Sequence, residues 1–349
     1  MQATSVNARN GKGGKAKKLL LLDDPKIKIA LDVIKKNTPI YDLFVACQNG
    51  NIQKVDEILS SGKVDVNQKD SHGATPLFVA IVGKQKDVVR LMLRYPKLDV
   101  NAPQLQHGSY PYLLYYYGYF DLFDELVATR PELRMENAIF TAISEMNRDF
   151  FHFFTSRNLS FDVNAFDKAD GKTALIKACE GCLVDLVMWL LGYPYTNTEL
   201  KGPDGLTALE VAIKMDFYSV IDLFLRIRSI DVNRLYDVGG VKNTLLHIFL
   251  MKERNGMEFV DYLARVSGID FERVNSNGST PLNVAMMRPN QNNVKLLLCC
   301  GADPKSVQRE FAIPENLRLL DQYLKNPGHC RKIWGFHRED LKIRDQETK

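Results

Sequence analysis

The sequence lacks any apolar run long enough to cross a membrane. Its first apolar run, Leu19–Leu22, has four residues and is followed at once by Asp23 and Asp24. A spanning helix needs about 18 apolar residues, and a secretory signal also needs a longer apolar core. The net charge is only +4, which gives no case for nucleic-acid binding by the whole chain. We therefore expect a cytoplasmic protein that can also enter the nucleus, and we expect no membrane partner.

The chain has little cysteine, and its spacing does not suggest a disulfide framework. Several of the cysteines fall within predicted helices, which suits reduced thiols in a reducing compartment. Cys179 and Cys182 have the spacing of a redox pair or half a zinc site, but no second pair lies at a suitable distance. His329, Cys330 and His337 are three further possible ligands, which we interpret as ordinary surface residues. The six cysteines are Cys47, Cys179, Cys182, Cys299, Cys300 and Cys330.

Motifs that carry catalysis are also missing. We find no phosphate-binding glycine loop, no HExxH pair and no nucleophile elbow. His247 has no nucleophile placed beside it in the sequence, as general base catalysis would require. The sequence predicts a protein that is not an enzyme and carries no cofactor.

What the sequence does contain is a motif that returns at intervals of 34 to 37 residues. It is clearest as Gly73-Ala-Thr-Pro-Leu77 and again as Gly278-Ser-Thr-Pro-Leu282. A fixed period of this length indicates stacked helical units. We mark the register of each copy by an alanine at a fixed place in the motif. Two irregular copies have Tyr115 and Phe249 at that place. With these marks, one interval is only 27 residues long. The alanines are Ala46, Ala80, Ala142, Ala178, Ala212 and Ala285.

Each unit has the same internal order. A glycine turn comes first, because glycine adopts positive φ without steric cost. Threonine then suits the N-cap of a short helix, and proline suits its first position. A second helix carries an apolar stripe, such as Val88, Val89 and Met92, which needs a neighbouring unit to bury it. The unit closes with Asp-Val-Asn, as at 65–67, 99–101, 162–164 and 231–233.

This pattern resembles the ankyrin repeat. Thr75-Pro-Leu77 and Thr280-Pro-Leu282 match the core of the family's motif, and Thr244-Leu-Leu-His247 keeps its histidine. The resemblance implies an all-α ankyrin-repeat solenoid of about eight units over residues 38–304, with capping helices at both ends. It also implies that His247 makes structural hydrogen bonds at the turn of its repeat.

Departures from the motif and changes of composition suggest six segments. In the fourth unit, near Met135–Asn164, the glycine turn and Thr-Pro-Leu are missing, so we expect two helices without a projecting hairpin and either a kink or a boundary there. Pro314–Leu324 is predicted to form a further helix. The segments are a disordered basic tail (1–18), an N-terminal capping helix (19–37), front repeats (38–134), a degenerate repeat (135–164), rear repeats (165–304), and a C-terminal helical cap and tail (305–349).

Ankyrin-like arrays bind partners through hairpin tips and the inner face of the first helices, and we map that face to positions two and three residues after the register mark. Methionine stands there beside lysine or arginine in three consecutive rear units, which would suit an amphipathic segment carrying acidic residues. The competing interpretation is that these methionines are core. A tyrosine cluster is a second candidate. The predicted contact residues are Tyr116, Tyr117, Glu145, Glu180, Lys214, Met215, Met251, Lys252, Met287 and Arg288.

The resemblance therefore favours a non-enzymatic scaffold or adaptor that holds a protein partner on the concave face. Two alternatives stay open. One is a regulatory inhibitor subunit that occludes a functional surface of its partner. The other is a zinc- or redox-linked protein that uses Cys179 and Cys182.

Overall fold

The computed structural model describes residues 38–70, 73–102, 109–157, 159–227, 230–238, 240–252 and 257–326. The predicted basic tail and N-terminal capping helix lie outside these residues, as do His329, Cys330 and His337. Contacts divide the chain into two compact units between Ala208 and Leu209, called the first and second units below. The boundary predicted between the front and rear repeats stays a prediction.

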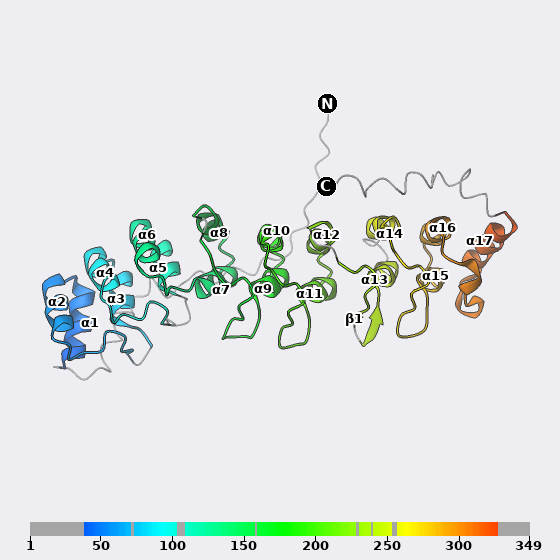
Figure 1. Cartoon of the computed structure of the whole chain (residues 1–349). Helices are drawn as coiled ribbons and strands as arrows, with labels where there is room; N and C mark the ends of the chain where they lie inside the picture. Colours follow the sequence, from blue (N-terminus) through cyan, green and yellow to red (C-terminus); the bar gives the residue numbers. More distant parts are fainter. Residues whose placement is uncertain are drawn as a thin grey trace, which may run out of the picture. The chain divides into compact units, whose positions relative to one another are not determined.

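Within the described residues, sixteen helices form eight successive pairs, followed by a single helix α17 (Pro314–Lys325), and this confirms the predicted all-α repeat fold (Figure 1). The pairs are α1 (Pro39–Asn49) with α2 (Ile52–Ser60), α3 (Pro76–Val82) with α4 (Lys86–Leu93), α5 (Tyr110–Tyr116) with α6 (Phe120–Thr129), α7 (Glu136–Ser144) with α8 (Arg148–Thr155), α9 (Ala174–Glu180) with α10 (Val184–Gly192), α11 (Ala208–Lys214) with α12 (Tyr218–Ile227), α13 (Leu245–Met251) with α14 (Met257–Ala264), and α15 (Pro281–Met286) with α16 (Gln291–Cys300).

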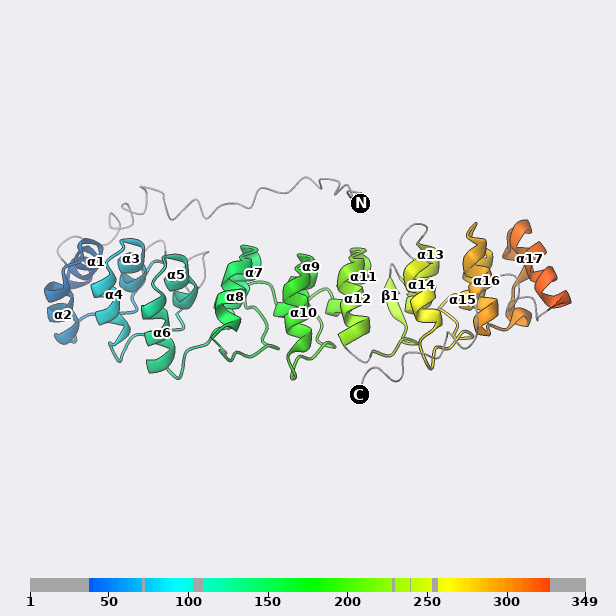
Figure 2. The same ribbon diagram turned by 90° about the horizontal axis from the view of Figure 1, so that it is seen from above.

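Each unit has two layers of helices, which can be followed in Figures 1 and 2. In the first unit, the first helices α1, α3, α5, α7 and α9 pack successively against one another, and α2 packs against α4. In the second unit, α13 packs against α15 and α14 against α16, on which α17 also packs. A stack of this kind buries one apolar face of every helix against the next pair.

The threonine–proline signature explains where the first helices begin. Threonine hydroxyls at the N-caps accept hydrogen bonds from the backbone N–H three residues on, at 3.2–3.4 Å, and proline occupies the first turn of α1, α3 and α15. These bonds satisfy donors that a helix start otherwise leaves unpaired. The capping threonines are Thr38, Thr75, Thr173, Thr244 and Thr280.

The register of the third pair differs from the prediction. The Tyr119 N–H donates to the carbonyl of Leu114, just as the Gln85 N–H donates to that of Ala80 and the Asn147 N–H to that of Ala142. Leu114, not Tyr115, therefore occupies the alanine position, and assigning Tyr115 to it was wrong. Three adjacent tyrosines follow Leu114, so side-chain identity alone did not decide the register.

The fourth pair consists of two helices without a projecting hairpin, as expected. Residues 130–135, all described and without a strand, connect α6 to α7, whereas residues 94–109 connect α4 to α5. Aromatic rings fill the space beside α8. The Phe153 ring lies 4.8 Å from both Tyr115 and Phe123, and Phe150 lies 5.0 Å from Tyr115. Large rings therefore supply the packing at this irregular junction.

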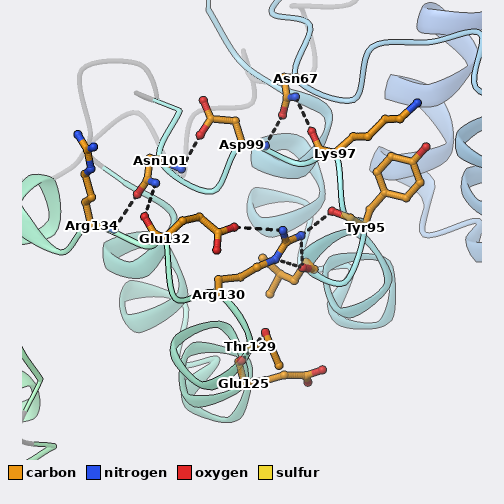
Figure 3. A network of polar contacts seen from close by, with 11 residues as sticks. Asn67, Tyr95, Lys97, Asp99, Asn101, Glu125, Thr129, Arg130, Glu132 and Arg134 are labelled. Atoms are coloured by element: carbon orange, nitrogen blue, oxygen red, sulfur yellow. Dashed lines mark hydrogen bonds and ion pairs between the residues drawn. The ribbon is translucent and has the colours of Figure 1, made fainter.

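The asparagines of the four Asp-Val-Asn motifs make hydrogen bonds to the next repeat, and Figure 3 shows two of them. The Asn67 Nδ2 donates to the carbonyl of Lys97, and its Oδ1 accepts from the N–H of Asp99, both at 2.8 Å. Asn101 makes the same two contacts, with the Glu132 carbonyl at 2.8 Å and the Arg134 N–H at 2.7 Å. The loops that carry the hairpins are thus tied to one another through side chains.

Hairpins project between some of the pairs. In the second unit, β1 (Tyr236–Val238) pairs antiparallel with β2 (Val241–Asn243). Isolated bridges join Phe166 to Thr173 and Lys201 to Thr207 in the first unit.

The helix predicted at Pro314–Leu324 is confirmed as α17.

Candidate functional site

The predicted contact residues of the second unit lie where the first helices end. Helix α11 ends at Lys214, α13 at Met251, and α15 at Met286, so the inner-face positions fall in the last turn or just beyond it. The last buried residues are Ile213, Leu250 and Met286. Side chains that follow them leave the core because the chain turns there toward the second helix of each pair.

Two of the three methionines are not core residues. Met215 and Met287 are 50% and 38% exposed, whereas the neighbouring Met286 is only 1% exposed. Met251 is half-buried. The interpretation of Met215 and Met287 as core is therefore wrong. Three adaptable thioether side chains lie at the same turn of three consecutive pairs.

The charges around these methionines are partly neutralised within the chain. Lys252 forms an ion pair with Asp216, whose φ of 56° places it in the left-handed region. Lys214 is exposed and Arg288 half-buried, and neither forms an ion pair with any other described residue. Two cations therefore remain available to a partner. The prediction missed Asp216, which lies one residue beyond the inner-face positions.

In the first unit, the tyrosine cluster divides between core and surface. Tyr110 and Tyr112 are buried, Tyr116 is 43% exposed, and Tyr117 is half-buried. The ring centroids of Tyr116 and Tyr117 lie 5.5 Å apart, with the ring planes at 75°. With Leu114 as the register mark, these two tyrosines occupy the inner-face positions of their pair.

The two acidic residues of the prediction differ in their surroundings. Glu145 is half-buried and makes no ion pair with the described residues. The carboxylate of Glu180 lies 2.6 Å from the Lys172 ammonium, and this bond raises the pKa of Lys172. Glu180 is thus already engaged within its own repeat, which lowers its value as a contact for a partner.

The cysteine pair does not have the environment of a reactive site. Cys179 is fully buried in α9, and burial raises the pKa of its thiol. A thiolate is the form that attacks disulfides or binds metal, and a raised pKa keeps Cys179 protonated. Cys182 follows the helix at φ 49°. Among the described residues, no group of three histidine, cysteine or carboxylate side chains is placed to hold a metal ion.

None of the helices formed by the described residues has the length and apolar character of a membrane span.

His247 makes the structural contacts that the resemblance implied. Its Nε2 lies 2.9 Å from the Ser279 carbonyl, so this nitrogen must carry the proton and donate. Its Nδ1 then accepts from the Thr244 hydroxyl at 2.7 Å. The ring joins two successive repeats of the second unit. Burial lowers the pKa of His247, against a smaller raising effect of its bond to Ser279.

This environment predicts a loss of stability in acid. Because the folded pKa is lowered, the contribution of His247 is complete above its unfolded pKa of about 6.5 and is lost as pH falls through the folded pKa. Urea unfolding at pH 7.5 should give His247→Gln a lower free energy of unfolding than the wild type. At pH 5.0 this difference in free energy should be smaller. An equal difference at both pH values would contradict a neutral, buried His247.

Comparison with known proteins agrees with this architecture. The family description "Ankyrin repeats (3 copies)" matches residues 5–104, 116–236 and 229–308. The human ankyrin repeat domain-containing protein 29 is 44% identical over 57 residues, which are 16% of this chain and 19% of that protein. The match thus spans about a fifth of that relative's length.

A solved structure is also similar. The crystal structure of the ankyrin repeat domain of Bcl-3, a member of the IkappaB protein family, aligns with a TM-score of 0.44 and 18% identity, over 75% of this chain and 98% of that one. Because the family description covers most of the sequence, the chain belongs to the ankyrin repeat family.

Proposed function

We propose that this protein is a non-enzymatic scaffold of the cytosol that binds a protein partner along the inner-face positions of its second unit. Ankyrin repeats are a general protein–protein interaction module. The observation that carries the proposal is the exposure of Met215 and Met287 in a region where neighbouring apolar residues are buried. Exposed apolar side chains that recur in register mark interaction surfaces more often than isolated ones.

The chemistry of this surface favours a particular kind of partner. First helices of neighbouring pairs pack about 8–10 Å apart, so the methionines present apolar contacts at regular intervals along one edge. Lys214 and Arg288 add cations at its two ends. An amphipathic segment with apolar side chains on one face and carboxylates beside them would bury the methionines and pair with both cations.

The test compares partner capture by matched variants of the full chain. The contact variant carries Met215→Glu, Met251→Glu and Met287→Glu. The control carries Met146→Glu and Met188→Glu, which change methionines that are also exposed but lie in the first unit. Circular dichroism first establishes that both variants fold. We expect the contact variant to retain at least about tenfold less partner than the wild type, as for loss of a binding hot spot, and the control to retain it fully.

Other results would contradict the proposal. Equal retention by both variants would move the contact away from the methionines. Loss in the control alone would place it in the first unit. If the retained partner is an enzyme, its activity in the complex distinguishes a scaffold from an inhibitor, because only an inhibitor lowers it.

A further inference from the structure

The side chains that contact a partner in the proposed function are also oxidisable. Met215 and Met287 are 50% and 38% exposed, and Met251 is half-buried. A peroxide that reaches a methionine sulfur converts the thioether into a sulfoxide, and this turns a flexible apolar side chain into a polar one. The contact surface of the second unit therefore carries chemical groups whose polarity an oxidant can change.

Burial makes this oxidation selective within the second unit. Met286 and Met287 are neighbours in the chain, but Met286 belongs to α15 and is only 1% exposed, whereas Met287 follows the helix. Solvent reaches the side chain of Met287, while close core packing shields that of Met286. Oxidation is thus directed to the contact positions and not to the methionine that supports the fold.

A cation stands next to each of the three contact methionines in the chain. These cations are Lys214, Lys252 and Arg288. Met146 and Met188, two exposed methionines of the first unit, have no cation directly beside them. A sulfoxide oxygen accepts hydrogen bonds, and bonds from charged donors are stronger than bonds from neutral ones. The contact methionines therefore have charged donors at hand for their oxidised form, unlike Met146 and Met188.

We propose that Met215 and Met287 are modification sites, and that their reversible oxidation to the sulfoxide releases the partner of the second unit. This inference rests on the proposed function. The oxidant is a peroxide: its O–O bond breaks, an S–O bond forms, the sulfur loses two electrons, and the peroxide is reduced to water. In the reverse step, a methionine sulfoxide reductase removes the oxygen as water, and two thiols supply the electrons by forming a disulfide.

Oxidation weakens the complex in two ways. A polar sulfoxide replaces an apolar thioether, and burying it against apolar side chains of the partner costs free energy. Its oxygen also offers an acceptor to Lys214 and Arg288, which form no ion pair with any other described residue, so it competes with the carboxylates of the partner. Both effects leave the fold intact, because Met215 and Met287 lie outside the core.

The test treats the full chain with hydrogen peroxide and locates the sulfoxides by peptide mass spectrometry. We expect Met215 and Met287 to be oxidised at least about tenfold faster than Met286, because exposure governs access of the oxidant. In the capture assay described for the proposed function, the oxidised chain should retain at least about tenfold less partner than the untreated chain. Incubation with the two methionine sulfoxide reductases, one for each sulfoxide epimer, should restore capture. Circular dichroism should be the same before and after peroxide.

A leucine variant is the matched control. Met215→Leu, Met251→Leu and Met287→Leu together keep the surface apolar but remove the sulfur, so this variant should capture the partner equally before and after peroxide. Cys299 and Cys300 also lie in the second unit. Dithiothreitol reduces oxidised thiols such as disulfides but not sulfoxides, so it should not restore capture by the peroxide-treated wild type.

Four results would overturn the proposal. Oxidation of Met286 as fast as that of Met287 would remove the selectivity. Loss of the partner by the peroxide-treated leucine variant, or recovery of the wild type with dithiothreitol, would assign the effect to other residues. Full capture by the oxidised wild type would refute release by oxidation; if the glutamate variant nevertheless loses the partner, the proposed contact itself stands. Full capture by both the oxidised chain and the glutamate variant would refute the proposed function as well.

Discussion

Phe150→Ala is expected to lower the free energy of unfolding of the first unit by about 3–5 kcal/mol, the range for removing a buried aromatic side chain. Phe150 is completely buried. Its ring centroid lies 5.2 Å from that of Tyr112 and 5.0 Å from that of Tyr115, both in edge-to-face contact. Alanine would remove these contacts and leave a cavity.

The position of Phe150 makes the effect larger than at an ordinary core site. The fourth pair has the short connection at residues 130–135 in place of a hairpin. Its contact with the third pair is made by α7 against α5 and by the rings of α8 against Tyr112 and Tyr115. Rings of Phe150, Phe153 and Phe154 continue from Tyr115 toward Trp189 of α10. Because the rings support one another, a cavity at Phe150 cannot collapse without moving its neighbours.

The measurement is urea unfolding followed by Trp189 fluorescence in a Trp334→Phe background, which reports on the first unit. Phe120→Ala is the matched control, because Phe120 belongs to the same cluster but is exposed. We expect it to cost less than about 1.5 kcal/mol, as removal of a partly exposed side chain forfeits less burial. Equal losses in the two variants would contradict a core role specific to Phe150.

Arg130→Ala is expected to destabilise the first unit by about 2–4 kcal/mol, since it removes charge-assisted hydrogen bonds and leaves the buried Leu93 carbonyl without a donor. The Arg130 side chain is only 10% exposed. Its Nε and Nη2 donate to the carbonyl of Leu93 at 3.1 and 2.8 Å, and Nη2 also donates to that of Tyr95 (Figure 3).

Leu93 is the last residue of α4, where helix carbonyls have no partner within the helix. Arg130 follows α6, so it satisfies these carbonyls from the next pair. A positive charge at a helix C-terminus also interacts favourably with the helix dipole. Without the guanidinium, the carbonyl of the buried Leu93 loses its donors, whereas the carbonyl of Tyr95 keeps the N–H of Leu98 at 3.0 Å.

Two variants separate these contributions in the same Trp189 assay. Arg130→Lys keeps the charge but loses the fork-shaped donor, so we expect it to recover only part of the loss. Arg134→Ala removes an exposed arginine four residues away and should change stability by less than about 0.5 kcal/mol. If Arg130→Ala lowers the free energy of unfolding no more than Arg134→Ala does, the hydrogen bonds of Arg130 to the end of α4 do not stabilise the unit.

The register error in the third pair illustrates where sequence reasoning stops. Thr-Pro at a helix start or glycine at a turn acts through its own backbone, so such signals are readable from a few residues. The third pair has Ser109 and a run of tyrosines instead. Only the backbone bond from Tyr119 to Leu114 assigns the alanine position to Leu114.

The sequence by itself determined the helix pairs and the final helix α17, which follow from periodicity and from capping chemistry, and both of these are local. The family and the structural role of His247 followed from the resemblance of its motifs to the ankyrin repeat. The tertiary structure alone decided that Met215 and Met287 are exposed, that Asp216 engages Lys252, and that aromatic rings replace a hairpin beside α8. Exposure and pairing depend on which repeat lies next to which side chain, and that is a property of the stack and not of one repeat.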